Sequence, residues 1–227
     1  MMMGLIKSKG NMYPWTDYHW NPVKGVCPFA CSYCYTHGPR FKNSKGPIRF
    51  DKKELDTKFG NGRTIFVGSK IDLWAEDIPE IWDLLILAAC QFYPRNKYLF
   101  QTKNPQRFYS FKNSFLLQTI LGVTLESNRD YPVLSGAPAI AERVSWMTQL
   151  RRKTSFDFMV SIEPILDFDL DLFVEMIKQI RPSFVSIGVD SKRHHLPEPS
   201  LEKIKQLLLA LRSVTDLKLK DNLKRLL

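Results

Sequence analysis

The sequence lacks any long apolar run. No stretch of its 227 residues approaches the roughly 20 apolar residues that an α-helix needs to cross a bilayer. The first residues, Met1 to Lys7, also lack the apolar segment of a signal peptide. We therefore expect no membrane segment and a cytoplasmic location.

Cysteine is scarce, and its distribution is uneven. Of the four cysteines, three lie within eight positions, at Cys27, Cys31 and Cys34. A disulfide framework would spread its pairs over a small secreted chain, whereas clustered thiols suit metal binding in a reducing compartment. The fourth, Cys90, follows the apolar residues 84–89 and is expected to be a small core residue.

Short turns between consecutive strands are also missing. Strand and helix patterns instead alternate about six times, with strands expected at residues 17–26, 64–69, 98–102, 119–125, 158–162 and 184–189. Such alternation is typical of a parallel sheet with helical crossovers. We predict an α/β fold, a partial (βα)6 barrel of the TIM type, although a doubly wound open sheet remains an alternative.

The length fits one domain. With 44% hydrophobic residues the chain has the composition of a folded globule. We expect a single domain over residues 1–227, beginning with a flexible segment at 1–16 and ending in a short edge segment at 213–227.

Polar residues follow the expected strands. In a barrel of this kind the site lies at the carboxyl ends of the strands. These ends carry Cys27, Ser69, Lys103, Glu126, Glu163 and Asp190. The sequence therefore predicts one polar rim on an apolar sheet.

The spacing of the clustered cysteines indicates a metal site. Three and then two residues separate Cys27, Cys31 and Cys34. Iron–sulfur clusters are held by thiolates, and three ligands on a cubane [4Fe–4S] cluster leave one iron open for chemistry. A zinc site completed by His37 or His19 is the alternative.

The cysteine loop, with Tyr33 before its last cysteine, resembles the CxxxCxxC signature of the radical S-adenosylmethionine superfamily. Residues 20–35 resemble the branch that contains spore photoproduct lyase-like proteins, because Asn-Pro precedes the loop and Tyr-Cys-Tyr closes it. Further segments are similar to phage Gp37/Gp68-type proteins of unassigned function, at residues 68–74, 99–105, 121–126 and 161–164.

This resemblance implies a [4Fe–4S] cluster on the three cysteines and S-adenosyl-L-methionine on the fourth iron. An electron from an external donor such as flavodoxin or ferredoxin would cleave S-adenosylmethionine, giving a 5′-deoxyadenosyl radical that abstracts a substrate hydrogen. The protein would orient the cofactors and exclude water.

The cofactor-binding residues that the resemblance implies are Tyr33, Gly68, Ser69, Lys103, Glu126, Ser161 and Glu163. Gly68-Ser69 departs from the usual pattern, in which a glycine-rich acidic turn follows the second strand. No catalytic residue is assigned, because no tyrosine or free cysteine stands out as a radical relay.

Positive charge is concentrated at the two ends of the chain. The net charge of +10 divides into +6 over residues 1–60, −1 over 61–191 and +5 over 192–227. A basic surface favours a polyanionic partner, so nucleic acid is a candidate substrate. Basic residues expected near the entrance are Lys7, Lys9, Lys24, Arg40, Lys218, Lys220, Lys224 and Arg225. Two alternatives remain, a merely soluble basic surface and a zinc-binding nucleic-acid-interaction protein without radical chemistry.

Overall fold

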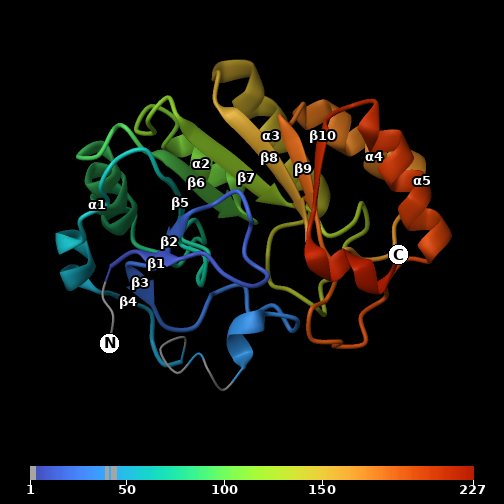
Figure 1. Cartoon of the computed structure of the whole chain (residues 1–227), viewed down its shortest axis with the longest axis horizontal. Coiled ribbons are helices and arrows are strands. Elements are labelled where there is room, and N and C mark those ends of the chain that lie inside the picture. The colour runs from blue at the N-terminus through green and yellow to red at the C-terminus, as the bar shows by residue number, and fades with distance from the viewer. Residues whose placement is uncertain (1–3, 39–40, 42–44) are drawn as a thin grey trace.

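A computed structural model describes residues 4–38, 41 and 45–227; residues 1–3 and Arg40 lie outside the described part. An eight-stranded sheet forms its centre (Figure 1). In spatial order its strands are β1 (Ile6–Lys7), β2 (Tyr18–Trp20), β5 (Thr64–Val67), β6 (Lys97–Thr102), β7 (Thr119–Thr124), β8 (Asp157–Ile162), β9 (Phe184–Ile187) and β10 (Asp216–Leu219). A separate antiparallel pair joins β3 (Val23–Lys24) to β4 (Arg49–Phe50).

Helices connect the successive strands of the sheet. The α-helices are α1 (Glu80–Gln91), α2 (Pro105–Ser110), α3 (Ile140–Lys153), α4 (Leu170–Ile180) and α5 (Leu201–Arg212). Short 3-10 helices are η1 (Tyr35–His37), η3 (Lys52–Asp56) and η4 (Asp221–Arg225). No described helix is both long and apolar enough to span a bilayer.

Strand order and direction define the sheet. From β2 to β10, the strands of the main sheet lie side by side in the order in which they occur along the chain, and every neighbouring pair is parallel. At the edge of the sheet, β1 pairs with β2 in the antiparallel direction. The order never reverses, so the sheet has no topological switch point of the doubly wound kind.

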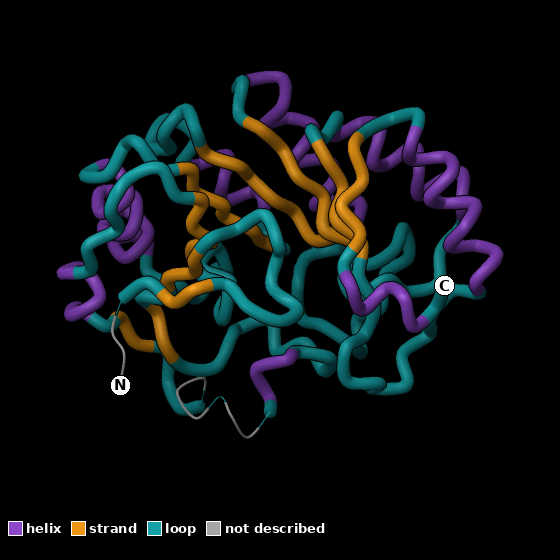
Figure 2. The backbone as a smooth tube through the Cα atoms, in the orientation of Figure 1, coloured by secondary structure: helices purple, strands orange, loops and turns teal. Residues whose placement is uncertain are grey.

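The two faces of the sheet bury different partners. Along β5, Ile65 and Val67 belong to the large core that also contains residues from all five α-helices, whereas Phe66 points to the opposite face. Because the α-helices of the described chain share one face (Figure 2), the helices do not cover both faces as in a doubly wound fold. The α/β partial barrel is confirmed.

The concave face is covered by the N-terminal segment, for which the sequence predicts flexibility. Tyr13 is 4% exposed, and its ring packs with Phe66 from β5. Trp15 meets Phe184 of β9 edge to face at 4.9 Å. Residues 12–15 therefore close the bottom of the barrel interior.

The C-terminal segment extends the sheet and returns toward the site. β10 pairs in parallel with β9 at the edge of the sheet, and η4 follows it. The Lys220 ammonium lies 2.7 Å from a Glu163 carboxylate oxygen beyond β8. The C-terminal segment thus reaches the carboxyl end of β8.

Candidate active site

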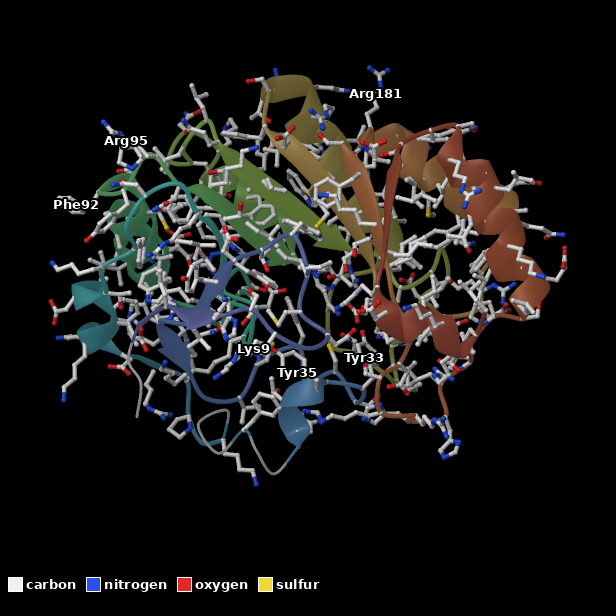
Figure 3. All side chains as sticks on the ribbon, viewed as in Figure 1. Lys9, Tyr33, Tyr35, Phe92, Arg95 and Arg181 are labelled. Atoms are coloured by element: carbon white, nitrogen blue, oxygen red, sulfur yellow. The ribbon has the colours of Figure 1, made fainter. Side chains whose placement is uncertain are left out.

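A cavity of about 720 Å³ opens at the carboxyl ends of the strands. In Figure 3, Lys9, Tyr33 and Tyr35 lie at this end of the molecule, while Arg95 and Arg181, which precede β6 and β9, lie at the opposite end. The cavity brings together Cys27, Cys31 and Cys34 with Tyr33, Gly68, Ser69, Lys103, Ser161 and Glu163. Among the site residues predicted from the sequence, Glu126 alone does not line it.

The cysteine loop is a series of tight turns fixed by the loop after β7. Cys34 N–H donates to the Cys31 carbonyl at 3.0 Å. Ser32 N–H donates to the Leu134 carbonyl, and Gly136 N–H donates to the Phe29 carbonyl, each at 2.8 Å. Residues 134–136 therefore hold the loop at its middle.

Each thiol has a hydrogen-bonding group beside it. Burial raises the pKa of Cys27 to about 12, with the Asp72 carboxylate adding to the effect, while backbone N–H groups oppose it. The Cys31 sulfur lies 3.1 Å from the Ser135 hydroxyl, and the Cys34 sulfur lies 3.0 Å from the Thr36 hydroxyl. Thiolates accept such bonds and thiols lose their protons on binding metal, so these groups fit an iron–sulfur cluster.

The histidines suggested for zinc do not complete a single-ion site. Within the described residues, no three His, Cys, Asp or Glu side chains are arranged to hold one metal ion. Zinc needs its ligands on one ion, whereas a cubane cluster binds one thiolate at each iron. Burial, with a contribution from Lys70, lowers the pKa of His19 to about 4.

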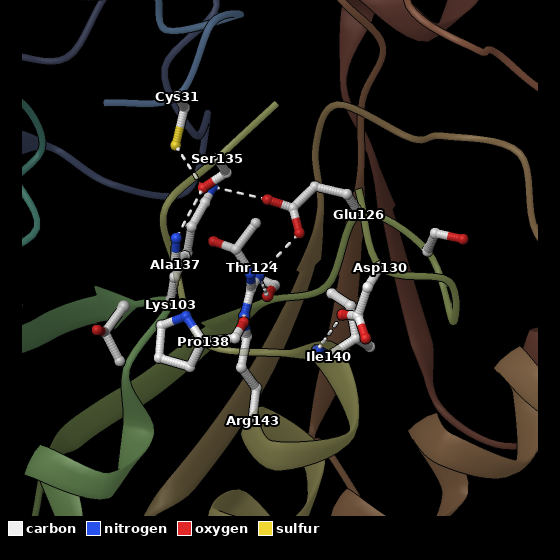
Figure 4. A network of polar contacts seen from close by, with 12 residues as sticks. Cys31, Lys103, Thr124, Glu126, Asp130, Ser135, Ala137, Pro138, Ile140 and Arg143 are labelled. Carbon is white, nitrogen blue, oxygen red and sulfur yellow. Dashed lines mark hydrogen bonds and ion pairs between the residues drawn. The ribbon is translucent and has the colours of Figure 1, made fainter. Parts of the chain in front are cut away.

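Glu126 is the centre of a buried ion network (Figure 4). One carboxylate oxygen, Oε1, lies 2.7 Å from Lys103 Nζ, and the other, Oε2, lies 2.8 Å from Arg143 Nη1. Burial alone would raise the pKa of Glu126, but the two cations outweigh burial and lower it to about 2. Tyr33 also donates to this carboxylate at 2.6 Å.

The ion network separates Glu126 from the main cavity. Its carboxylate lines a smaller cavity of about 250 Å³ beyond Tyr33, while Lys103 lies between it and the main cavity. For Lys103, burial would lower the pKa, but Glu126 reverses the effect and raises it well above its ordinary value. Glu126 therefore neutralises Lys103, and Lys103 faces the main cavity.

The turn after β5 requires glycine at its first position. Gly68 has φ +79°, and a Cβ there would lie 2.5 Å from the Leu73 Cγ. Next to it, the Ser69 carbonyl accepts a bond from the Tyr35 hydroxyl at 2.6 Å, and the Ser69 hydroxyl donates to Asn21 at 3.2 Å. This turn is therefore tied to the residue that follows Cys34.

Ser161 and Glu163, at the end of β8, contact the N-terminal and C-terminal segments of the chain. The Ser161 hydroxyl lies 2.8 Å from the Tyr13 hydroxyl. Glu163 pairs with Lys220 and accepts a bond from Asn11 at 3.1 Å. Both side chains border the cavity with part of their hydrogen-bonding capacity already used.

Asp72 is a site residue that sequence reasoning missed. It lines the cavity and accepts hydrogen bonds from Lys103 N–H at 2.7 Å and the Thr102 hydroxyl at 2.8 Å. Burial raises its pKa above the ordinary value. The signal in the sequence was a lone carboxylate within the apolar run 71–75, directly after the Gly68-Ser69 turn.

Lysines line the mouth of the cavity, but most of them are not among the basic residues that the sequence predicts near the entrance. Lys9, Lys70 and Lys192 line the cavity, and in the described chain none of them forms an ion pair with a carboxylate. The ammonium groups of Lys70 and Lys192 each lie 6.0 Å from the centre of the Phe41 ring. Lys192 also donates to the Tyr35 carbonyl at 2.8 Å.

The other basic residues expected at the entrance have different neighbours. Lys220 lines the cavity but is paired with Glu163, and Lys218 lies over the Phe184 ring at 3.8 Å. Three further expected residues form ion pairs away from the cavity: Lys24 with Glu54, Lys224 with Asp221, and Arg225 with Glu198. The free positive charge at the mouth therefore comes mainly from residues outside the expected set.

Comparisons with known proteins identify the fold. No family model matches the chain, and the curated proteins give no significant match. Solved structures of spore photoproduct lyase do match: a cysteine-to-serine variant at TM-score 0.65 and 12% identity, over 95% of this chain and 80% of that one. The lyase complexed with a dinucleoside spore photoproduct matches at TM-score 0.64 and 12% identity, over 93% and 79% of the two chains.

A third structure, a double variant of the same lyase with bound AdoMet and the dinucleoside spore photoproduct, has TM-score 0.58 and 13% identity. It is matched over 90% of this chain and 64% of its own length. The structural resemblance to spore photoproduct lyase, which the cysteine loop predicts, is confirmed at the level of the fold. The similarity to phage Gp37/Gp68-type proteins stays a prediction.

Proposed function

We propose that this chain is a radical S-adenosylmethionine enzyme that acts by hydrogen abstraction. The observation that carries the proposal is the position of Cys27, Cys31 and Cys34, which open onto the carboxyl-end cavity of a partial barrel with the spore photoproduct lyase fold. A solved structure of that lyase contains bound AdoMet, which supports the same cofactor here.

The chain's own residues bind and orient the cofactors. The three thiolates would hold a [4Fe–4S] cluster, leaving one iron for S-adenosylmethionine. When bound and reduced by an external donor, these cofactors supply the radical that removes a substrate hydrogen. Candidate contacts to S-adenosylmethionine are the cavity-lining residues Tyr33, Gly68, Ser69, Lys103, Ser161 and Glu163, and Glu126 acts through Lys103 and Tyr33.

The protein around the cavity also excludes water. Phe29 and Phe66 line it together with Met12 of the N-terminal segment. Apolar walls lower the local dielectric and keep a reactive radical from side reactions.

The proposed substrate is a nucleic acid. Lys9, Lys70 and Lys192 at the mouth carry charge available to phosphates, and Tyr35 and Phe41 offer aromatic rings beside them. Phosphates bind lysines and bases stack on aromatic side chains. The solved complex of spore photoproduct lyase with a dinucleoside lesion supports this substrate class.

Anaerobic reconstitution with iron and sulfide tests the cofactor chemistry. After reduction with S-adenosylmethionine present, we expect 5′-deoxyadenosine from the native chain and none from Cys31→Ala. The matched control is Cys90→Ala, because Cys90 is buried in α1 and does not line the cavity. Full iron loading without 5′-deoxyadenosine would contradict the proposal, and a colourless zinc protein would favour the zinc alternative.

A further inference from the structure

Hydroxyl groups lie beside two of the three cysteine sulfurs. Ser135 Oγ is 3.1 Å from Cys31 Sγ, and Thr36 Oγ1 is 3.0 Å from Cys34 Sγ. The two hydroxyls come from different parts of the chain, since Thr36 lies in η1 and Ser135 lies in the loop between β7 and α3. Neither residue belongs to the cysteine motif.

The direction of these hydrogen bonds follows from the chemistry of the sulfur. A thiol bound to iron has lost its proton, so the sulfur can only accept. The Ser135 oxygen already accepts a bond from the Ala137 N–H at 3.2 Å, which leaves its O–H free to donate to Cys31. With a cluster bound, both hydroxyls are therefore donors.

Backbone contacts on both sides fix the Ser135 hydroxyl in place. Leu134, before it, accepts the Ser32 N–H, and Gly136, after it, donates to the Phe29 carbonyl. Thr36 is only 6% exposed, so its hydroxyl is held within the protein rather than in solvent. A donor that does not reorient keeps its effect on the charge it faces.

Cys27 has a different set of donors. Backbone N–H groups of Asp72 and Phe29 act on its thiol, where they oppose the rise in pKa that burial causes. Such donors remain when side chains change, whereas the Ser135 and Thr36 hydroxyls depend on residue type. Ser135 and Thr36 are therefore two positions at which a substitution would remove a hydrogen-bond donor from a cysteine sulfur.

We propose that Ser135 and Thr36 are positioning residues that raise the reduction potential of the cluster by donating hydrogen bonds to Cys31 and Cys34. A reduced cluster carries one more negative charge, so a fixed donor stabilises it more than the oxidised cluster. This inference rests on the proposed function, because it requires a cluster on the three cysteines.

An EPR-monitored redox titration of the anaerobically reconstituted protein tests the inference. We expect a more negative midpoint potential in Ser135→Ala and in Thr36→Val, with the larger shift in the double variant. Ser135→Thr and Thr36→Ser, which keep the hydroxyl, should return the potential toward that of the native chain. Ser32→Ala is the matched control, because Ser32 lies in the same loop but its side chain is exposed.

The outcomes separate this inference from the proposed function. Unchanged potentials in both Ser135→Ala and Thr36→Val, each with four irons per chain, would overturn the inference and leave the cluster enzyme intact. Failure of the native chain to bind iron and sulfide would overturn the proposed function and the inference with it. If Ser135→Ala does not load iron, Thr36→Val on the other segment still decides the question.

Discussion

Glu126 combines deep burial with full charge, and its two cationic partners, with the Tyr33 hydroxyl, stabilise the buried carboxylate. It is 4% exposed, and its oxygens face Lys103 and Arg143. Removing one partner of a buried ion network leaves uncompensated charge, which is far more costly than losing a surface pair. The network is therefore sensitive to single substitutions.

Glu126→Gln should destabilise the protein by about 3–5 kcal/mol at pH 7, because two buried cations lose their counter-charge. The pKa of Glu126 is lowered to about 2 from the ordinary 4.5, so its contribution is full above pH 4.5 and is lost as the pH falls toward 2. Urea unfolding of both proteins at pH 7 and pH 3 measures the difference, which should shrink at the lower pH.

Glu142→Gln provides the control for this test, since Glu142 is exposed on the same helix as Arg143. It should leave the free energy of unfolding almost unchanged. Equal stability of Glu126→Gln and the native chain at pH 7 would show that the network does not hold the charge as described.

Residue spacing marks the three cysteines as candidate ligands because the function of such a motif depends on local sequence. Partners such as Arg143 for Glu126, or Lys220 for Glu163, lie 17 and 57 residues away. No local pattern marks such pairs, since the fold alone brings them together. The same reason explains why Ser135, 104 residues from Cys31, was not a candidate.

At the scale of elements, apolar runs identified the buried strands. The predicted strands 98–102 and 158–162 lie within β6 and β8, which are largely buried. Two-residue strands such as β1 and β4 carry no periodic signal and lie outside the expected strands. The sequence could not separate a barrel from a doubly wound sheet, because the face that a helix covers is decided by packing.

Residue types that suit a helix cap do not form one at two helix starts. Asp77, three residues before Glu80, is of such a type, but α1 follows Pro79 without a side-chain cap. Asp169 does precede α4, yet its carboxylate bonds to Arg129 and Asn128 rather than to the helix. A side chain that suits a cap is also suited to other partners that the fold supplies.

Packing of the N-terminal segment against the sheet should contribute measurably to the stability of the protein. Tyr13→Ala should cost about 3 kcal/mol, because a buried aromatic ring and its bonds to Gln101 and Ser161 are lost from the concave face. Lys9→Ala, at an exposed position of the same segment, should change stability by less than about 0.5 kcal/mol. Thermal or urea unfolding measures the stability of both variants. Equal stability of Tyr13→Ala and the native chain would contradict the packing of this segment against the sheet.

At the scale of the whole molecule, charge at the cavity mouth should govern nucleic-acid binding. We expect the affinity for single-stranded DNA to fall steeply as salt increases. Lys70→Ala with Lys192→Ala should weaken binding and lower the slope of log affinity against log salt by about 1.4, if each lysine contacts one phosphate.

The control for this measurement is Lys178→Ala with Lys205→Ala, which removes the same charge from α4 and α5 on the convex side. Fluorescence anisotropy with a labelled oligonucleotide at several salt concentrations gives the slopes. Binding that is insensitive to salt, or equal slopes for the two double variants, would contradict a phosphate-binding mouth.

The sheet ends at β1 and β10, and both ends are poor templates for other chains. β1 has only two residues, while β10 alternates charged and apolar residues, with Asp216 before Leu217 and Lys218 between Leu217 and Leu219. Short and charged outer strands discourage the addition of a foreign strand, which is the first step of aggregation. The protein can therefore leave its barrel unclosed without becoming prone to polymerise.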